Sequence, residues 1–247
     1  MDVNAIYVLW LRELKRFFRS KARILGTVIM PVFFLLGLGF GFNSLVKIPG
    51  VGNYIQYIVP GIIGMTILFI GVFSGFQVLW DRQFGFLKEI MVTPNSRVSI
   101  TLGRIAGGAT TALVPSMIVL VLSLGVGFAP VLSLEMLWMI PFLVLIGVSF
   151  ISLGLIISSF VDDPQGFSSI VNFFTFPLLF LSGAIFPMGV FPSSVQYVGY
   201  FNPLTYGIDG MRYALTGASA YPPLLDLGAI LVASVLLLAL AAFTAKR

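Results

Sequence analysis

The basic residues of this chain lie mainly in three short clusters, and long stretches without charge separate them. Of its 14 Lys and Arg residues, six fall within positions 1–23, four within 82–104 and two at the end. A helix needs about 20 apolar residues to cross the hydrocarbon core of a bilayer. The uncharged stretches reach this length, and only 9% of the residues are charged, compared with roughly 25% in a soluble domain. The sequence therefore predicts an integral membrane protein.

The uncharged stretches predict an all-α fold with six membrane-spanning helices in a single domain, 1–247. We place them at 24–46, 58–80, 105–128, 136–160, 166–186 and 225–244. Pro187, Pro192 and Pro203 interrupt the long apolar segment after the fifth span. Because proline breaks helices, and because irregular backbone at membrane depth must be buried or line a cavity, we expect re-entrant helices over 188–217.

The distribution of positive charge predicts the orientation. Lys and Arg collect in cytoplasmic segments, and an even number of spans places both termini and the loop after the second span on one side. That side then holds 12 of the 14 basic residues. We therefore expect a multi-pass protein of the cell (plasma) membrane with both termini in the cytoplasm. Asp163 and Pro164 suit the cap and the first turn of the fifth span.

Residues 1–23 predict a helix that lies in the membrane interface. One helical face is apolar, and basic residues occupy much of the rest; the apolar residues are Val3, Tyr7, Trp10, Leu14 and Phe17. Such a helix binds anionic headgroups, so membrane lipid is an expected partner. The alternative is a basic flank that only sets the orientation.

The residues that are missing exclude several classes of function. The chain has no His and no Cys, which excludes thiol nucleophiles, histidine bases and metals bound by either residue. It also lacks the GxxxxGK[ST] phosphate loop. No charged residue lies in the middle of a predicted span, which argues against an ion-coupled carrier. We expect no enzyme activity, no metal or cofactor on this chain, and no nucleic-acid partner.

The loop after the second span predicts a short cytoplasmic helix over 81–94. Phe84, Leu87 and Met91 recur at helical spacing, polar residues lie between them, and Pro94 ends the segment. A short helix with an apolar stripe lies on the membrane or fits a groove in a soluble partner.

Two motifs in this chain resemble those of the type-2 ABC exporter permeases. The first follows the second span, with Arg82, Gly85, Lys88, Glu89, Thr93 and Pro94 in the family's order. The second precedes the last span: Asn202-Pro-Leu-Thr-Tyr206, followed by Asp209, Gly210 and Arg212. The likeness covers the whole chain and is strongest to the daunorubicin-resistance-like drug-export permeases.

The resemblance implies a subunit that an ATPase drives. Segment 81–94 would be the coupling helix that enters a cleft on an ABC ATPase, which would bind ATP and Mg and be present in two copies. The coupling residues would be Arg82, Phe84, Gly85, Leu87, Lys88, Glu89, Met91, Thr93 and Pro94. The permease would form a homodimer or pair with a close paralogue. It would move an amphipathic, lipid-like or drug-like substrate outward by alternating access.

The resemblance also implies an outer gate over 188–217 and a substrate path along spans two and five. The gate residues would be Asn202, Pro203, Tyr206, Asp209 and Arg212, with Asp209 and Arg212 pairing locally or making a solvated surface contact. Small polar residues share a helical face in each path span: Thr66, Ser74 and Gln77 in span two, and Ser168, Asn172, Thr175 and Ser182 in span five. The alternative is ordinary hydrogen bonding between packed membrane helices.

Two further points stay open at this stage. Three pairs of glycines with GxxxG spacing, at 37 and 41, 71 and 75, and 103 and 107, permit close helix contact without saying which helices meet. An ATP-independent secondary carrier or channel is the alternative function, and a membrane scaffold is a third. Family membership does not choose a substrate.

Overall fold

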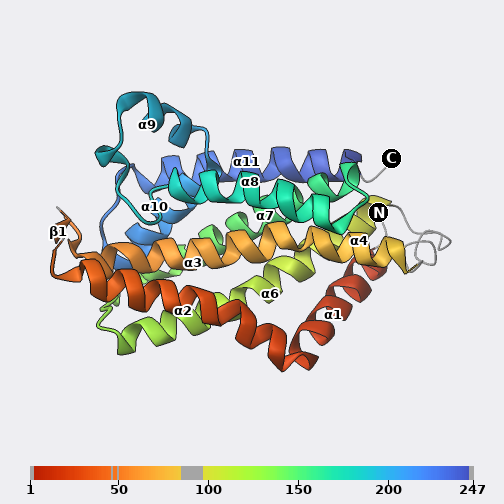
Figure 1. Cartoon of the computed structure of the whole chain (residues 1–247), viewed down its shortest axis with the longest axis horizontal. Helices are drawn as coiled ribbons and strands as arrows, with labels where there is room; N and C mark the ends of the chain where they lie inside the picture. Colours follow the sequence, from red (N-terminus) through yellow and green to blue (C-terminus); the bar gives the residue numbers. More distant parts are fainter. Residues whose placement is uncertain (1–2, 46, 49, 85–96, 245–247) are drawn as a thin grey trace.

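The computed structural model describes residues 3–45, 47–48, 50–84 and 97–244 (Figure 1). These residues form a helical bundle with one short hairpin. In the hairpin, the two-residue strand β1 (Lys47–Ile48) pairs antiparallel with the two-residue strand β2 (Gly52–Asn53). Five helical segments are long and apolar enough to cross a membrane: Lys21–Asn43, Tyr54–Gln83, Val98–Gly125, Leu134–Phe160 and Pro223–Thr244. The prediction of a helical membrane protein is confirmed, with five candidate spans among the described residues where the sequence predicts six.

The first two helices meet at Ser20. α1 (Val3–Arg19) ends there, and the Ser20 hydroxyl accepts a hydrogen bond from the backbone N–H of Arg23 to cap α2 (Lys21–Asn43). α1 lies mainly against α6 (Arg97–Gly125). Of its predicted apolar face, Phe17 is buried and Val3 is exposed. The basic N-terminal segment is thus a helix of its own, set at an angle to the first span (Figure 1).

α3 (Tyr54–Phe73) forms the centre of the bundle. It is buried along most of its length and contacts α2, α6, α7, α8 and α10. After Ser74 the chain continues as α4 (Gly75–Gln83). α7 (Met139–Phe160), which packs against α3, follows the short 3-10 helix η1 (Leu134–Trp138).

Glycines decide which helices approach most closely. A Cβ on Gly154 of α7 would lie 2.3 Å from the carbonyl oxygen of Val72, so this contact requires glycine. Gly71 and Gly75 lie on the other side of the same contact, and Gly103 and Gly107 of α6 bring it against α1. At Gly37 and Gly41 of α2, a Cβ would meet no described atom within 4 Å. Two of the three glycine pairs with GxxxG spacing, those at 71 and 75 and at 103 and 107, therefore lie in helix contacts within the chain.

The predicted fifth span is shorter in the structure. α8 (Pro164–Phe180) has 17 residues, about 26 Å at 1.5 Å per residue, and ends at Phe180 rather than at 186. Asp163 caps its start, accepting a hydrogen bond of 2.6 Å from the Gly166 N–H, as predicted. Beyond its end, Gly183 adopts a left-handed φ of 73°, a conformation that favours glycine.

The segment after α8 consists of short helices. These are η2 (Met188–Val190), α9 (Ser193–Tyr200) and α10 (Pro203–Thr216), and α11 (Pro223–Thr244) follows. Asn202 and Pro203 separate α9 from α10, where the sequence predicts a bend. α10 packs against α3, α7 and α11, so it belongs to the core of the bundle.

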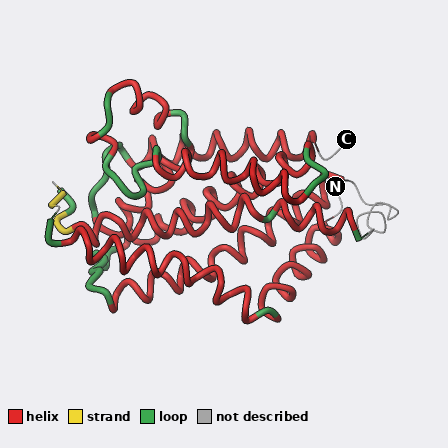
Figure 2. The backbone as a smooth tube through the Cα atoms, in the orientation of Figure 1, coloured by secondary structure: helices red, strands yellow, loops and turns green. Residues whose placement is uncertain are grey.

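The bundle has two distinct ends. The start of α1, the end of α4, the loop between α7 and α8 and the end of α11 lie at one end (Figure 1). The hairpin, α9 and the connections around α10 lie at the other, and the loops of the described residues gather at these two ends (Figure 2). We call them the inner end and the outer end.

Candidate functional site

A buried carboxylate holds three helices together at the inner end. Asp81 of α4 accepts a hydrogen bond of 2.8 Å from Arg104 of α6. Arg12 and Arg16 of α1 lie 3.5 Å and 4.0 Å from the same carboxylate. Asp81 and Arg104 are both buried. Because a buried charge is tolerated only with compensating charge and hydrogen bonds, this cluster fixes α1 against α4 and α6.

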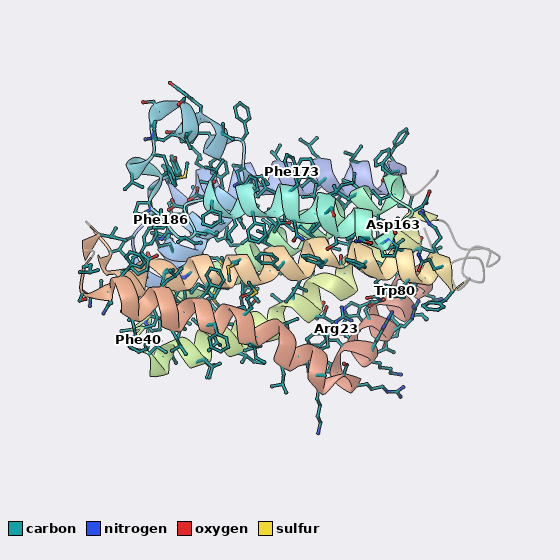
Figure 3. The ribbon with its side chains drawn as sticks, viewed as in Figure 1. Arg23, Phe40, Trp80, Asp163, Phe173 and Phe186 are labelled. Carbon is teal, nitrogen blue, oxygen red and sulfur yellow. The ribbon has the colours of Figure 1, made fainter. Side chains whose placement is uncertain are left out.

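A second polar contact extends the inner cluster. The Gln77 amide of α4 donates to the Glu13 carboxylate of α1 at 2.7 Å. Beside it is a small cavity of about 30 Å³ lined by both residues together with Arg23, Arg104 and Ser74, among others. Figure 3 shows Arg23 on the side of α2 that faces this region.

Two of the predicted coupling residues are described, and they lie at the end of α4. Arg82 forms an ion pair of 2.5 Å with Asp162, in the loop between α7 and α8. Phe84 is 77% exposed and stacks on Trp80, with ring centroids 5.6 Å apart. The other predicted coupling residues lie outside the described residues: Gly85, Leu87, Lys88, Glu89, Met91, Thr93 and Pro94.

Sequence reasoning missed Asp81 as a site residue. Its signal was an acidic residue directly after the apolar run of the second span, one position before Arg82. Its basic partners on α1 carried no such signal, because the contact joins residues that are distant in the sequence.

At the outer end, Arg212 of α10 is the centre of a second polar cluster. Its Nη1 donates to Asp209 at 3.0 Å, and its Nη2 donates to the carbonyl of Gly183 at 2.9 Å. The guanidinium lies 4.0 Å from the ring centroid of Tyr57, an arrangement that favours a cation–π interaction. Tyr57 in turn donates its hydroxyl to the Gly183 carbonyl.

The predicted pair of Asp209 and Arg212 is buried. The two residues are 3% and 6% exposed, so the alternative of a solvated surface contact is wrong. The second oxygen of Asp209 accepts backbone N–H bonds from Ala220 and Tyr221, at 2.7 Å and 3.0 Å. The pair therefore joins α10 both to the turn after α8 and to the connection before α11.

The remaining predicted gate residues fix the start of α10. Asn202 donates from Nδ2 to the Leu178 carbonyl at 2.6 Å, and its Oδ1 accepts from the Leu204 N–H at 3.0 Å. Pro203 occupies the first turn, where a missing N–H costs least. Tyr206 donates its hydroxyl to the Tyr200 carbonyl at 2.8 Å. These bonds link α8, α9 and α10.

Tyr213 and Tyr221, at this end of the bundle, remain neutral near physiological pH. Partial burial, together with Tyr200, raises the pKa of Tyr221 to about 12. The hydrogen bond that Tyr213 donates to Glu135 raises the pKa of that tyrosine as well. The outer cluster therefore takes its charge from carboxylate and guanidinium groups.

The predicted path residues of span two line two different spaces. Ser74 and Gln77 line the small inner cavity, whereas Thr66 lines a separate groove of about 290 Å³ between α1, α2 and α3. Neither of these two spaces is lined by the predicted residues of span five: Ser168, Asn172, Thr175 and Ser182. Helices α3 and α8 do pack together.

Most of these path hydroxyls bond to their own segment. Those of Thr66, Ser74 and Ser182 donate to carbonyls three or four residues earlier. Thr175 is fully buried, and its hydroxyl has no hydrogen-bond partner among the described residues. On the opposite face of α8, Phe173 points away from the bundle (Figure 3).

These features define a multi-pass membrane protein with one polar cluster at each end of its bundle and, in the part of the chain that the structure describes, no charge in the middle of a candidate span. Comparison with known proteins assigns the family. The family model of the ABC-2 type transporter matches residues 4–216. The chain belongs to this family of transport permeases.

Named relatives agree with this assignment. The chain is 27% identical to the inner membrane transport permease YadH of Escherichia coli K12, over 92% of this chain and 89% of that protein. It is 27% identical to nodulation protein J of Rhizobium leguminosarum bv. viciae, over 85% of this chain and 82% of that protein. It is also 27% identical to the transport permease ycf38 of Cyanophora paradoxa, over 88% of this chain and 76% of that protein.

Proposed function

We propose that this chain is the membrane-spanning subunit of an ATP-driven exporter. It has no nucleotide-binding motif of its own, so a separate ABC ATPase, present in two copies, supplies ATP, Mg and hydrolysis. The permease pairs with a second copy of itself or with a close paralogue. The observation that carries the proposal is the match to the ABC-2 type transporter over nearly the whole chain.

The inner end supports a role in coupling. The first residues of segment 81–94 belong to the end of α4, where the buried cluster around Asp81 connects α4 to α1 and α6. The ion pair of Arg82 with Asp162 adds the loop between α7 and α8. A force applied to the segment by an ATPase would therefore reach three helices and this loop through charged contacts. We propose that this end faces the cytoplasm, together with both termini.

The outer end supports a gate. α10 carries a buried ion pair and is bonded to the backbone before and after it. We propose that α8 completes six spans and that 188–217 re-enters the membrane from outside. The substrate, amphipathic and lipid-like or drug-like, would then pass along α3 and α8 by alternating access.

Reconstitution of the protein with its ATPase tests the function. We expect export of an amphipathic dye from proteoliposomes only when both subunits and ATP are present. Leu87→Asp and Glu89→Lys should insert normally into the membrane but lose the ATPase on co-purification, because an unpaired charge in an apolar groove is strongly unfavourable. Ser194→Ala, at an exposed position of α9 at the outer end, is the control and should retain the ATPase.

The alternative function makes the opposite prediction. A secondary carrier or channel would move the dye without ATP and without an ATPase, and the two docking variants would transport as well as the wild type. Either result would contradict the proposal.

A further inference from the structure

The start of α11 carries a buried carboxyl group that no described donor reaches. Asp226 is fully buried, and neither of its side-chain oxygens has a hydrogen-bond partner among the described residues. A carboxylate placed in an apolar environment without a donor is very unfavourable, and the group takes up a proton instead. The hydrogen bonds of the outer cluster described above do not involve this residue.

The neighbours of Asp226 are the charged groups of the outer cluster. It interacts electrostatically with Asp209 and Arg212 of α10, and Tyr206 also faces it. Nη1 of Arg212 donates to Asp209 and Nη2 donates to the carbonyl of Gly183, while its Nε has no hydrogen-bond partner among the described residues and does not bond to Asp226. One guanidinium therefore lies beside two carboxyl groups and is bonded to only one of them.

No other described charge compensates a second carboxylate here. α7, which also packs against α10 and α11, contains no charged residue. Glu135 of η1 accepts the hydroxyl of Tyr213. Partial burial raises the pKa of Tyr206, and Tyr221, as stated above, stays neutral as well. Tyr57 contributes its ring to Arg212.

We propose that Asp226 and Asp209 form a proton-binding pair at the outer end of the bundle. Asp226 holds the proton and donates it to a carboxylate oxygen of Asp209, which remains the negative partner of Arg212. A hydrogen bond between two carboxyl groups needs one proton, and with that proton the three side chains sum to zero charge. The proton comes from the aqueous phase at this end and returns to it.

The pair links proton binding to the position of α11. Asp209 is bonded to the connection before α11 through Ala220 and Tyr221, and Asp226 lies in the first turn of that helix. Loss of the proton leaves two like charges in a buried site, which repel each other. A rise in pH on the outer side therefore loosens α10 from α11.

Infrared spectroscopy of the full-length protein in lipid tests the pair. We expect the carbonyl stretch of a protonated carboxylic acid at neutral pH, which disappears in Asp226→Asn and which, in the wild type, disappears as the pH is raised. Asp163→Asn is the matched control, because it removes an exposed carboxylate while asparagine can still cap α8; it should keep the band. The absence of the band in the wild type, or its persistence in Asp226→Asn, would overturn the proposal.

Thermal unfolding in detergent separates the pair from its main rival, an ionised Asp226 that a water molecule bridges to Arg212. An acid that is protonated in the folded state and ionised in the unfolded state makes the protein less stable as the pH rises. We expect this slope in the wild type and a flatter curve for Asp226→Asn, with at least wild-type stability at neutral pH. Lower stability of Asp226→Asn with an unchanged slope would support the water-bridged carboxylate instead.

Discussion

Arg104 donates a hydrogen bond to Asp81 across 2.8 Å, between two buried side chains at the inner ends of α6 and α4. The same carboxylate also lies near Arg12 and Arg16 of α1. One acidic residue thus organises the N-terminal helix and two core helices, at the first position of the segment that the family resemblance assigns to coupling.

Removal of this carboxylate should destabilise the inner end. Asp81→Asn leaves a buried guanidinium without its counter-charge, which costs about 3–5 kcal/mol for a buried pair. We expect a lower unfolding temperature in detergent and less ATP-dependent transport. The control is Asp162→Asn, which removes the ion pair of an exposed carboxylate and should cost about 0–1 kcal/mol. Equal effects of the two substitutions would show that the Asp81 cluster has no special role.

The close contact between α7 and α3 at Gly154 should not tolerate a methyl group. In Gly154→Ala, the new Cβ would lie 2.3 Å from the carbonyl oxygen of Val72, so α7 must move away from α3. We expect a loss of about 1–3 kcal/mol, as for other overpacked cores, measured by thermal unfolding. Gly37→Ala is the matched control, because its Cβ meets no described atom within 4 Å, and its stability should not fall. A wild-type unfolding temperature for Gly154→Ala would contradict the packing described here.

Replacement of Asn202 and Pro203 by alanine should disturb the outer end alone. The double variant loses the bond from Asn202 to Leu178 and the cap of α10, and without Pro203 the α9–α10 bend is no longer enforced. We expect leak of small solutes or loss of export from proteoliposomes, with ATPase binding retained. Wild-type export without leak would show that the segment is an ordinary surface connection and not a gate.

The orientation can be checked with single cysteines, because the chain has none of its own. Cysteine at Ser194 or Ala220, both exposed at the outer end, should react in intact cells with a thiol reagent that does not cross the membrane. Cysteine at Ser20, Ser96 or Ala245 should react only after the cells are opened. Labelling of the Ser96 variant from outside would place the predicted coupling segment on the wrong side for an ATPase.

Hydropathy and local signals predicted much of the fold. The apolar stretches located the helices to within a few residues at most ends, because length and charge alone decide which segments fit a bilayer. The cap at Asp163 and the bend at Asn202 were also predicted, since both depend on residues that are close in sequence. The fifth span ended at Phe180 rather than at 186, because Gly183 turns the chain there.

The clusters were harder to predict, because they join residues that are far apart in the chain. The contact of Asp81 with Arg12 depends on how α1 lies across α6, which no local pattern specifies. The same holds for the burial of Asp226, which lies at the start of the last predicted span and is fully buried in the structure. Polarity along a helical face likewise did not show that Thr66 and Gln77 line separate spaces.

The end of α8 and the turn that follows it are anchored to other helices through main-chain carbonyl groups. These carbonyls accept hydrogen bonds from Tyr54, Tyr57, Arg212 and Asn202. A carbonyl group is the same whatever residue carries it. A change of side chain at position 178 or 185 therefore leaves these anchors in place, although Ile185 is buried and its replacement must still fit the core. Gly183 is constrained by its φ of 73°. Side chains along this stretch can thus vary, within the limits of packing, on a constant backbone.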